Sequence, residues 1–308
     1  MRTWTRTGPV VVEVDGSAEG LRVVDYAALE AIRSGTELVL AAPYPGHSSK
    51  NPTTPGDQPK PPAELADASL RIAVAHVRYN YGYGLPLTAV SAVGSRLKVL
   101  SQAARNARVV VVGRTRTRGP HRLVAAQANI FLAVRADCPV IVVPLTWKPS
   151  ELDRRVAVGI DGTSLSTEAV GFAFGTAADR EGGVIVVHAA HAPRHDSDRD
   201  GVEQSWVRRA DVLVAETLAG WTDEYPEVKV TRYLTARPVV EALLHEGAQA
   251  GLVVLGARAG LLPVCDPVTR RTVAAMTGPV AIVPHHLTPA EPDRRGRESL
   301  DRREVMVR

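Results

Sequence analysis

Short apolar runs alternate with longer amphipathic stretches along most of the chain. The apolar run Val10–Val14, for example, is followed by a stretch in which Leu21, Val24, Ala28 and Ile32 recur at helical spacing. The apolar runs are continuous instead of alternating with polar residues, which is typical of parallel strands covered by helices on both faces. In the first half we expect strands at Val10–Val14, Leu38–Ala42, Leu87–Val93, Val109–Val112 and Val140–Val143, and helices at Leu21–Ile32, Ala63–Tyr81, Ser95–Asn106 and between the last two strands.

The second half of the chain repeats this order of elements. We expect strands at Val156–Ile160, Val184–His188 and Val228–Tyr233 and two more within Leu252–Pro284, with helices at Ser166–Ala178, from the polar loop Ala192–Asp200 to about Tyr225, and at Val239–Ala250. The agreement element by element predicts a tandem duplication. A chain of 308 residues is long enough for two domains, each with its own core. We place the domains at 8–145 and 154–285, with a linker at 146–153.

Two polar segments interrupt or follow this pattern. Pro43–Pro62 is dense in proline, glycine and serine and is expected to be a long surface loop, either a functional lid or disordered; we favour disorder. Residues 286–308 mix both charges with little apolar content, so we expect a disordered tail.

Composition and charge narrow the class of protein. Apolar residues make up 45% and charged residues 23%, as in globular domains, and no apolar run reaches the roughly 20 residues of a membrane span. The N-terminus lacks the apolar region of a signal peptide, and Cys138 and Cys265 are far apart, so we expect a cytoplasmic protein with no membrane association. The net charge of +4 is mild, and no aromatic residues are interleaved with the basic ones, which argues against nucleic-acid binding.

The stretch Val109–Pro144 combines an apolar strand, a glycine, an arginine-rich loop, a helix and a second strand. Leu252–Pro284 repeats this unit. A strand that ends in glycine and leads through a loop into a helix can form a phosphate site, because loop and helix N–H groups point at the anion. Both halves therefore contain the backbone frame of an anion site.

An ordered set of short motifs resembles the universal stress protein family, twice in one chain. The motifs are VEVDGS and VGIDGT after the first strands, VVVVGR and VVLGAR at the fourth strands, Arg237-Pro238 before a helix, and the closing CPVIVVP and GPVAIVP. The resemblance implies an α/β fold of two tandem doubly wound, Rossmann-like domains. Each would have a five-stranded parallel sheet of order 3-2-1-4-5, and the fifth strands, Val140–Val143 and Ala281–Val283, would pair within the chain as a pseudo-dimer.

Many members of the family bind ATP and others do not. The resemblance also implies where ATP would bind in this chain. Asp15 and Asp161 would lie at the adenosine end, beside the backbone of Ala42 and Val187. Gly113 and Gly256 match the first glycine of the family's phosphate motif. For Asp15 and Asp161 the alternative is that each caps the helix that follows.

The rest of the phosphate motif departs from the family pattern. In the first domain Arg116 replaces the second glycine and Ala126-Gln127 replaces the Gly-Ser pair, although Arg114 and Arg116 would still attract phosphate by charge. We therefore leave ATP binding in the first domain open. Gln127 would lie at the end of the phosphate motif there. In the second domain Asp266-Pro267 replaces the Gly-Ser pair, and its carboxylate would occupy the helix N–H groups and repel a polyphosphate. This argues against ATP binding in the second domain.

No other motif indicates catalysis. The polar cluster His188, His191, His195, Asp196, Asp198 and Asp200 has no ligand spacing fixed on one element, so we predict no metal site. Signatures of hydrolases and P-loop proteins are absent from the sequence. We expect a non-catalytic, stress-response binding module with degenerate nucleotide clefts, whose partners are a second copy of the chain, an unidentified protein or a small nucleotide. The alternative is an ATP-binding, slowly hydrolysing protein that uses the first cleft.

Overall fold

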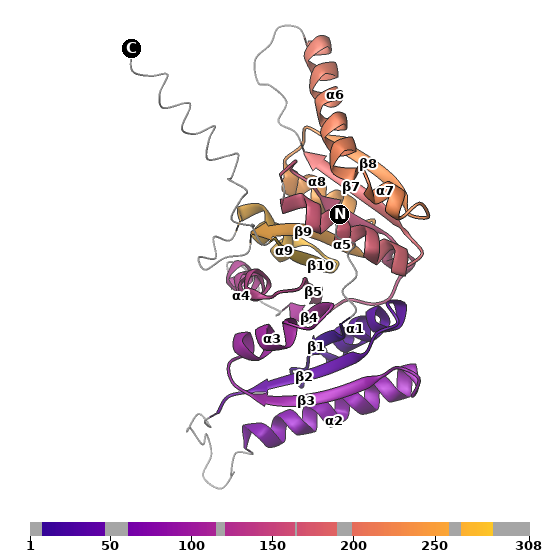
Figure 1. Cartoon of the computed structure of the whole chain (residues 1–308). Coiled ribbons are helices and arrows are strands. Elements are labelled where there is room, and N and C mark those ends of the chain that lie inside the picture. Colours follow the sequence, from indigo (N-terminus) through magenta and orange to yellow (C-terminus); the bar gives the residue numbers. More distant parts are fainter. Residues whose placement is uncertain are drawn as a thin grey trace.

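The structure is a computed structural model that describes residues 8–46, 61–114, 121–163, 165–189, 199–258 and 266–285, without the side chains of 121–126, 165 and 199–206. Strands and helices alternate through both halves of the chain (Figure 1). The first half contains β1 (Val10–Glu13), α1 (Leu21–Arg33), β2 (Leu38–Tyr44), α2 (Pro62–Tyr81), β3 (Leu87–Val93), α3 (Arg96–Ala104), β4 (Val109–Arg114), α4 (His121–Arg135) and β5 (Val140–Pro144).

The second half begins after a short 3-10 helix, η1 (Glu151–Arg154), which lies in the segment predicted to be a linker. It contains β6 (Val156–Gly159), α5 (Leu165–Asp179), β7 (Gly183–Ala189), α6 (Arg199–Leu218), α7 (Trp221–Glu224), β8 (Lys229–Thr235), α8 (Val239–Gly247), β9 (Leu252–Arg258), α9 (Pro267–Ala275) and β10 (Val280–His285). The predicted alternation of strands and helices is thus confirmed, with ends that shift by a few residues.

The strands of the described residues form one sheet of order β3-β2-β1-β4-β5-β10-β9-β6-β7-β8. Each half has the predicted order 3-2-1-4-5, and its strands are parallel. The halves join where β5 and β10 pair antiparallel, with Ile141 opposite Ala281. The predicted intrachain pairing of the fifth strands is confirmed.

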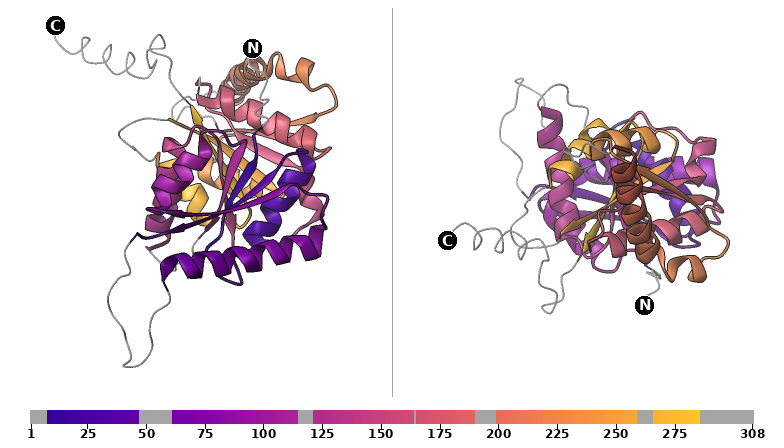
Figure 2. Two further views of the ribbon diagram at one scale, coloured as in Figure 1. Left: turned by 60° about the horizontal axis from the view of Figure 1, so that its bottom comes forward. Right: turned by 90° about the horizontal axis from the view of Figure 1, so that it is seen from above.

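Helices cover both faces of this sheet (Figure 2). One core cluster lies under α1, α2, α5, α6 and α7, and the other lies under α3, α4, α8 and α9. Each cluster contains buried residues of both halves, for example Val143 and Val283 in the first and Val142 and Ile282 in the second. The duplicated halves therefore share continuous hydrophobic cores instead of meeting at a polar surface.

The prediction of one helix that continues to about Tyr225 is wrong in one respect, because the helix breaks before Trp221. Gly220 has φ +84°, which is left-handed, so it ends α6 and starts the short α7. The turn directs Trp221 into the core, where its ring stacks on Phe174 at 6.5 Å between centroids. Most of the predicted loop Pro43–Pro62 and all of the predicted tail 286–308 lie outside the described residues, whereas β2 extends to Tyr44.

Candidate functional site

The order of the strands reverses between β1 and β4 in the first half and between β6 and β9 in the second. In open parallel sheets, ligands bind beyond the carboxyl ends of the strands at such a reversal. Asp15 and Gly113 lie at this edge in the first half, and Asp161 and Gly256 lie at the equivalent edge in the second. The sheet thus brings each predicted aspartate to the same edge as the predicted glycine of its domain.

The side chain of Asp15 closes its own loop. Its Oδ1 accepts hydrogen bonds from the backbone N–H of Ser17 at 2.9 Å and from the Ser17 hydroxyl at 2.8 Å. The Ser17 Oγ in turn accepts from the N–H of Gly20. Gly20 is the N-cap residue of α1, and no side chain caps this helix directly. Asp15 therefore organises the turn before α1 through Ser17 and does not cap the helix itself.

Asp161 makes a denser set of contacts at the equivalent position. Its Oδ1 accepts from the backbone N–H of Thr163 at 2.9 Å and from the hydroxyls of Thr163 and Ser166 at 2.6 and 3.0 Å. The next residue, Gly162, has φ +78°, and a Cβ there would lie 2.5 Å from the Leu213 side chain. The hydroxyls of Thr163 and Ser166 and the Leu213 side chain of α6 therefore fix the conformation of this loop.

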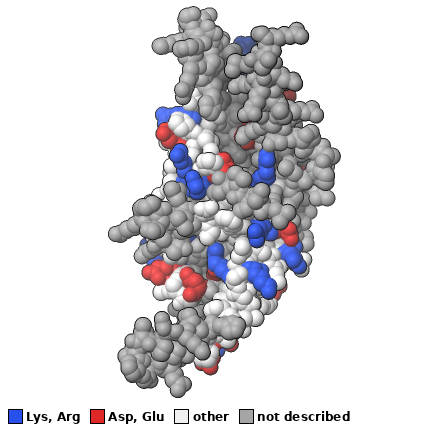
Figure 3. All heavy atoms as spheres, turned by 90° about the vertical axis from the view of Figure 1, so that its left-hand side faces the viewer, with Lys and Arg blue, Asp and Glu red and all other residues white. Residues whose placement is uncertain are grey.

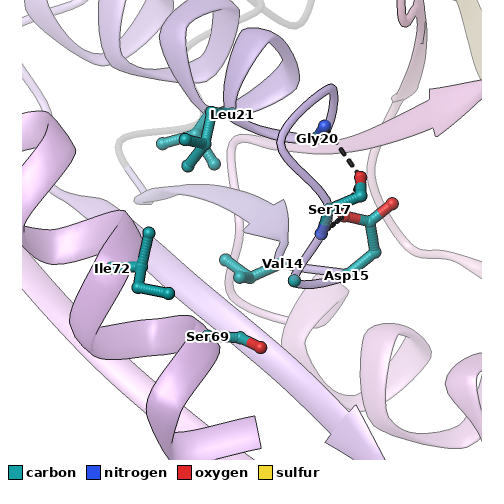
Figure 4. Close-up of a pocket in the computed structure, with 9 residues that line it drawn as sticks. Val14, Asp15, Ser17, Gly20, Leu21, Ser69 and Ile72 are labelled. Atoms are coloured by element: carbon teal, nitrogen blue, oxygen red, sulfur yellow. Dashed lines mark hydrogen bonds between the residues drawn. The ribbon is translucent and has the colours of Figure 1, made fainter. Parts of the chain in front are cut away.

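A small hollow lies beside the Asp15 loop, between α1 and α2. Figure 4 shows Leu21 of α1 and Ser69 and Ile72 of α2 around it, with Val14 and Ser17 on the loop side. Its volume is about 10 Å³, which is room for about one water molecule. The hollow is far too small for a nucleoside, let alone a nucleotide.

A charged network lies on the other side of the sheet and connects β1, α3 and α4. Arg96 forms a two-pronged ion pair with Glu13, with Nε–Oε1 at 2.6 Å and a second contact to Oε2 at 2.8 Å. The same guanidinium donates to Asn129 Oδ1 at 2.9 Å, and the Asn129 amide lies 3.5 Å from the carbonyl oxygen of Gly113. The network links the ends of β1 and β4 at the point where the family resemblance places a ligand.

Sequence reasoning did not predict this network. Two signals were available in the sequence: Glu13 is a carboxylate in the otherwise apolar run Val10–Val14, and Asn129 is an amide next to the apolar run Ile130–Val134. A polar group that such a pattern buries needs a partner. Neither signal identifies Arg96, because that contact depends on how α3 packs.

In the second half, apolar side chains occupy the place that is equivalent to the Glu13–Arg96 network. Gly159 occupies in β6 the position that Glu13 has in β1. A Cβ on Gly159 would lie 3.0 Å from a methyl group of Leu243 and 3.1 Å from one of Leu255. The two halves therefore differ at this place, which holds an ion pair in the first and leucine side chains in the second.

The remaining predicted residues lie in varied surroundings. The Arg114 guanidinium donates to the carbonyl oxygens of Val273 and Met276 at the end of α9, so it joins the halves. Ala42 and Val187 are buried in β2 and β7, Gly256 is half-buried in β9, and Gln127 is half-buried on α4. Arg116 lies outside the described residues.

Asp266 caps α9, as its position before Pro267 predicts. Its Oδ2 accepts from the backbone N–H of Thr269 at 3.2 Å and lies 3.3 Å from the Thr269 hydroxyl. The carboxylate thus uses an N–H group of the helix start that an anion would need.

Basic side chains are dispersed over the face onto which the strands open. Figure 3 views this side, which is the left-hand edge in Figure 1, and shows acidic side chains beside several of the basic ones in its described part. In the part of this face that the structure describes, charged side chains are spread out instead of concentrated at one place.

Of the polar cluster from His188 to Asp200, only the side chain of His188 lies in the described part of the chain. His188 is buried, and its Nδ1 donates to the carbonyl oxygen of Ile160 at 3.0 Å. No group of three His, Cys, Asp or Glu side chains in the described ranges could hold a metal ion. In the same ranges, every helix is too short or too polar to cross a bilayer.

Comparisons with known proteins agree with this architecture. A sequence model of the universal stress protein family matches residues 7–144 and 154–284. A universal stress protein of Mycolicibacterium smegmatis is 29% identical over 287 residues, covering 89% of this chain and 96% of that protein. One from Mycobacterium tuberculosis is 33% identical over 165 residues, which cover 52% of this chain and 56% of its own length.

A solved universal stress protein structure from Archaeoglobus fulgidus has the same fold. Its TM-score is 0.61 at 14% identity, covering 91% of this chain and 97% of that one. A universal stress protein structure from Pseudomonas aeruginosa gives a TM-score of 0.59 at 14% identity, covering 91% and 94% of the two chains.

Proposed function

The chain belongs to the universal stress protein family, and from this premise we propose that it is a non-catalytic binding module of the stress response, acting in the cytoplasm. Its two nucleotide clefts are degenerate in this proposal. The ligand is a protein partner or a small molecule other than ATP.

The single observation that carries the proposal is the Glu13–Arg96 ion pair in the first cleft. A guanidinium at this edge would suit a phosphate, but here a carboxylate of the same chain already binds it through two hydrogen bonds. A phosphate would have to displace Glu13 and lie beside the freed carboxylate. A hydrogen bond to a charged group contributes about 1.5–3 kcal/mol, so the exchange weakens binding by one to two orders of magnitude.

The second cleft supports the same conclusion by a different route. Asp266 occupies a helix N–H group, Pro267 lacks one, and leucine side chains pack against Gly159. A polyphosphate would meet a negative charge and an apolar wall. We therefore expect neither domain to hold ATP.

The proposal is tested by denaturing the full-length protein and analysing any nucleotide released. Calorimetric titration of the native chain with ATP and AMP gives the affinity. We expect no nucleotide on denaturation and no measurable heat of binding. ATP recovered near one equivalent, and lost in Asp15→Ala, would contradict the proposal and favour the ATP-binding alternative.

A variant of the same cleft tests the reason for weak binding. Glu13→Gln keeps a similar shape but leaves the positive charge of Arg96 uncompensated, so we expect its titration with ATP to give a measurable heat of binding. Arg96→Ala on the Glu13→Gln background should remove the gain. Glu64→Gln, on the exposed surface of α2, changes the net charge equally and should have no effect.

A further inference from the structure

Strand β3 lies at one end of the sheet and pairs, among the described residues, with β2 alone (Figure 1). In a parallel pair, alternate residues of a strand bond to the same neighbour, and the residues between them point their N–H and C=O groups the other way. The Leu38 N–H donates to the carbonyl oxygen of Pro86, and the Gly94 N–H donates to that of Tyr44. The even-numbered residues of β3 therefore bond to β2. The backbone groups that face outward are those of Leu87, Ala89, Ser91 and Val93.

The side chains of β3 do not protect this edge. The strand contains neither a charged residue nor a proline, which are the residues that commonly keep an exposed edge from pairing with another chain. Val90 and Val93 are 45% and 58% exposed. The outer edge of β3 is therefore a template on which an extended chain can pair.

The edge strand of the second half, β8, is protected where β3 is not. It carries the exposed residues Lys229 and Arg232. Arg232 Nη1 forms an ion pair at 2.9 Å with Asp211 Oδ1 of α6, the helix that packs on this strand. A basic side chain on an edge strand disfavours pairing with a further strand. The duplicated fold thus has one protected edge and one unprotected edge.

The registers of the sheet show which residue of β3 is equivalent to Arg232. In the first half, Leu38 pairs with the first residue of β1 on one side and with Leu87 on the other. In the second half, Val184 pairs with the first residue of β6 and with Val230. Two residues further along the edge strands are the equivalent residues Ala89 and Arg232.

Helices α2 and α6 align through the glycines that they cover. Ser69 of α2 lies over Gly16, and Leu213 of α6 lies over the equivalent glycine of the second half. Two residues before these are Asp67 and Asp211, which are therefore equivalent. Asp67 is exposed and forms no ion pair within the described ranges. The first half thus has the acid of the second half's ion pair, but an alanine in place of its arginine.

We propose that β3 binds an extended segment of another polypeptide as an added strand, and that a lysine or arginine of this segment pairs with Asp67. The proposal rests on the binding role proposed above and names the kind of partner. Outward N–H and C=O groups at every second residue match the backbone of an extended chain. The basic side chain of the added strand takes the role that Arg232 has beside Asp211.

The same charges disfavour a second β3 strand as the partner. Because β3 has no charged residue, a copy of it would bring no basic side chain to Asp67. The partner is therefore a different segment, with uncharged residues suited to a strand and one basic residue among them.

The test titrates the native full-length chain with a fluorescent peptide of sequence Thr-Val-Thr-Val-Arg-Val-Thr-Val-Thr and follows its anisotropy. We expect saturable binding at concentrations below about 1 mM. The same peptide with glutamate in place of arginine should bind roughly 10-fold more weakly, because it brings a like charge to Asp67. Amide hydrogen exchange locates the added strand: the N–H groups of Ala89 and Ser91 should become protected when the arginine peptide binds.

Two variants block the edge by different means. Ala89→Arg supplies the arginine that the second half has, and Ser91→Pro removes an outward N–H group without removing a bond to β2. Each should weaken binding of the arginine peptide at least roughly 10-fold and should unfold at the same urea concentration as the native chain.

A matched pair of variants tests the charge. Asp67→Asn should make the arginine and glutamate peptides bind about equally. Glu64→Gln, which removes the same charge from an exposed acid of the same helix, should preserve the difference between the two peptides.

Absence of saturable binding by the native chain, or equally tight binding by Ser91→Pro, would overturn the proposal. Protection of the same amides by self-association of the free chain would also overturn it, since the partner would then be a second copy. The nucleotide analysis is independent of these outcomes. ATP released on denaturation contradicts the proposed function whether or not the peptide binds, whereas a chain that releases no ATP and binds no peptide contradicts only the role of β3.

Discussion

His285 is a buried polar residue at the end of β10. Neither ring nitrogen has a hydrogen-bond partner among the described residues, and Glu168 Oε1 lies 3.6 Å from Nδ1. That distance is beyond hydrogen-bond range. The equivalent residue after β5 is Leu145, which packs against Gly113. The second half thus buries a polar ring at a position where the first half has an apolar side chain.

We expect His285→Leu to stabilise the protein. An unpaired buried polar group costs about 1–3 kcal/mol, so the free energy of unfolding in urea should rise by about 1 kcal/mol. The reverse change in the first half, Leu145→His, serves as a matched control and should lower it by a similar amount. A loss of stability in His285→Leu would show that the ring has a stabilising contact.

At one position of α5, the packing of α7 leaves room only for a glycine. Gly171 lies in α5, and a Cβ there would be 2.4 Å from the Trp221 ring. The ring is held in place because Gly220 turns the chain between α6 and α7 and because Trp221 also stacks on Tyr225. The break in the predicted long helix and this glycine are therefore two parts of one packing arrangement.

Gly171→Ala should destabilise the fold despite the higher helix propensity of alanine. Propensity favours alanine by about 1 kcal/mol, whereas overpacking a rigid aromatic site costs about 1–3 kcal/mol. We expect a net loss of about 1 kcal/mol in urea denaturation, together with altered tryptophan fluorescence. Gly84→Ala, where a Cβ meets nothing within 4 Å, should change stability by less than about 0.5 kcal/mol.

Across the whole molecule, a buried ion-pair network joins the two halves. The Arg180 side chain, 1% exposed, donates to Tyr26 Oη at 2.7 Å, Glu30 Oε1 at 2.8 Å and the Asp153 carbonyl oxygen at 2.7 Å. Burial alone would lower the pKa of Arg180, but Glu30 and Tyr26 raise it above its ordinary value. Arg108 pairs with Asp179 nearby. These contacts cross from α1 to the end of α5, so the halves are held together by more than the β5–β10 pair.

Arg180→Met should lower the free energy of unfolding by about 3 kcal/mol, because it leaves Glu30 buried with less compensation. The estimate is at the lower end of the usual range, since Arg33 still pairs with Glu30 at 3.1 Å. Adding Glu30→Gln should recover part of the loss, as the uncompensated charge is then removed. If the double variant is less stable than Arg180→Met, unpaired charge is not the cause of the loss.

The local pattern of the sequence determined most of the architecture. Continuous apolar runs predict buried parallel strands, and their repetition predicts two similar halves; the structure confirms both, together with the order 3-2-1-4-5 that the family resemblance implies. Asp266-Pro267 likewise predicts its helix cap, because a cap depends on residues three apart. Such features follow from neighbours in the chain, so a single sequence is enough to find them.

Only the tertiary structure decided which charged side chains meet beyond the ends of the strands. Glu13 and Arg96 are 83 residues apart, and Arg114 reaches α9 across 159 residues. Their contacts depend on how helices pack on the sheet, which no local pattern specifies. The strands follow from local hydrophobicity, whereas the site and the surface follow from long-range packing.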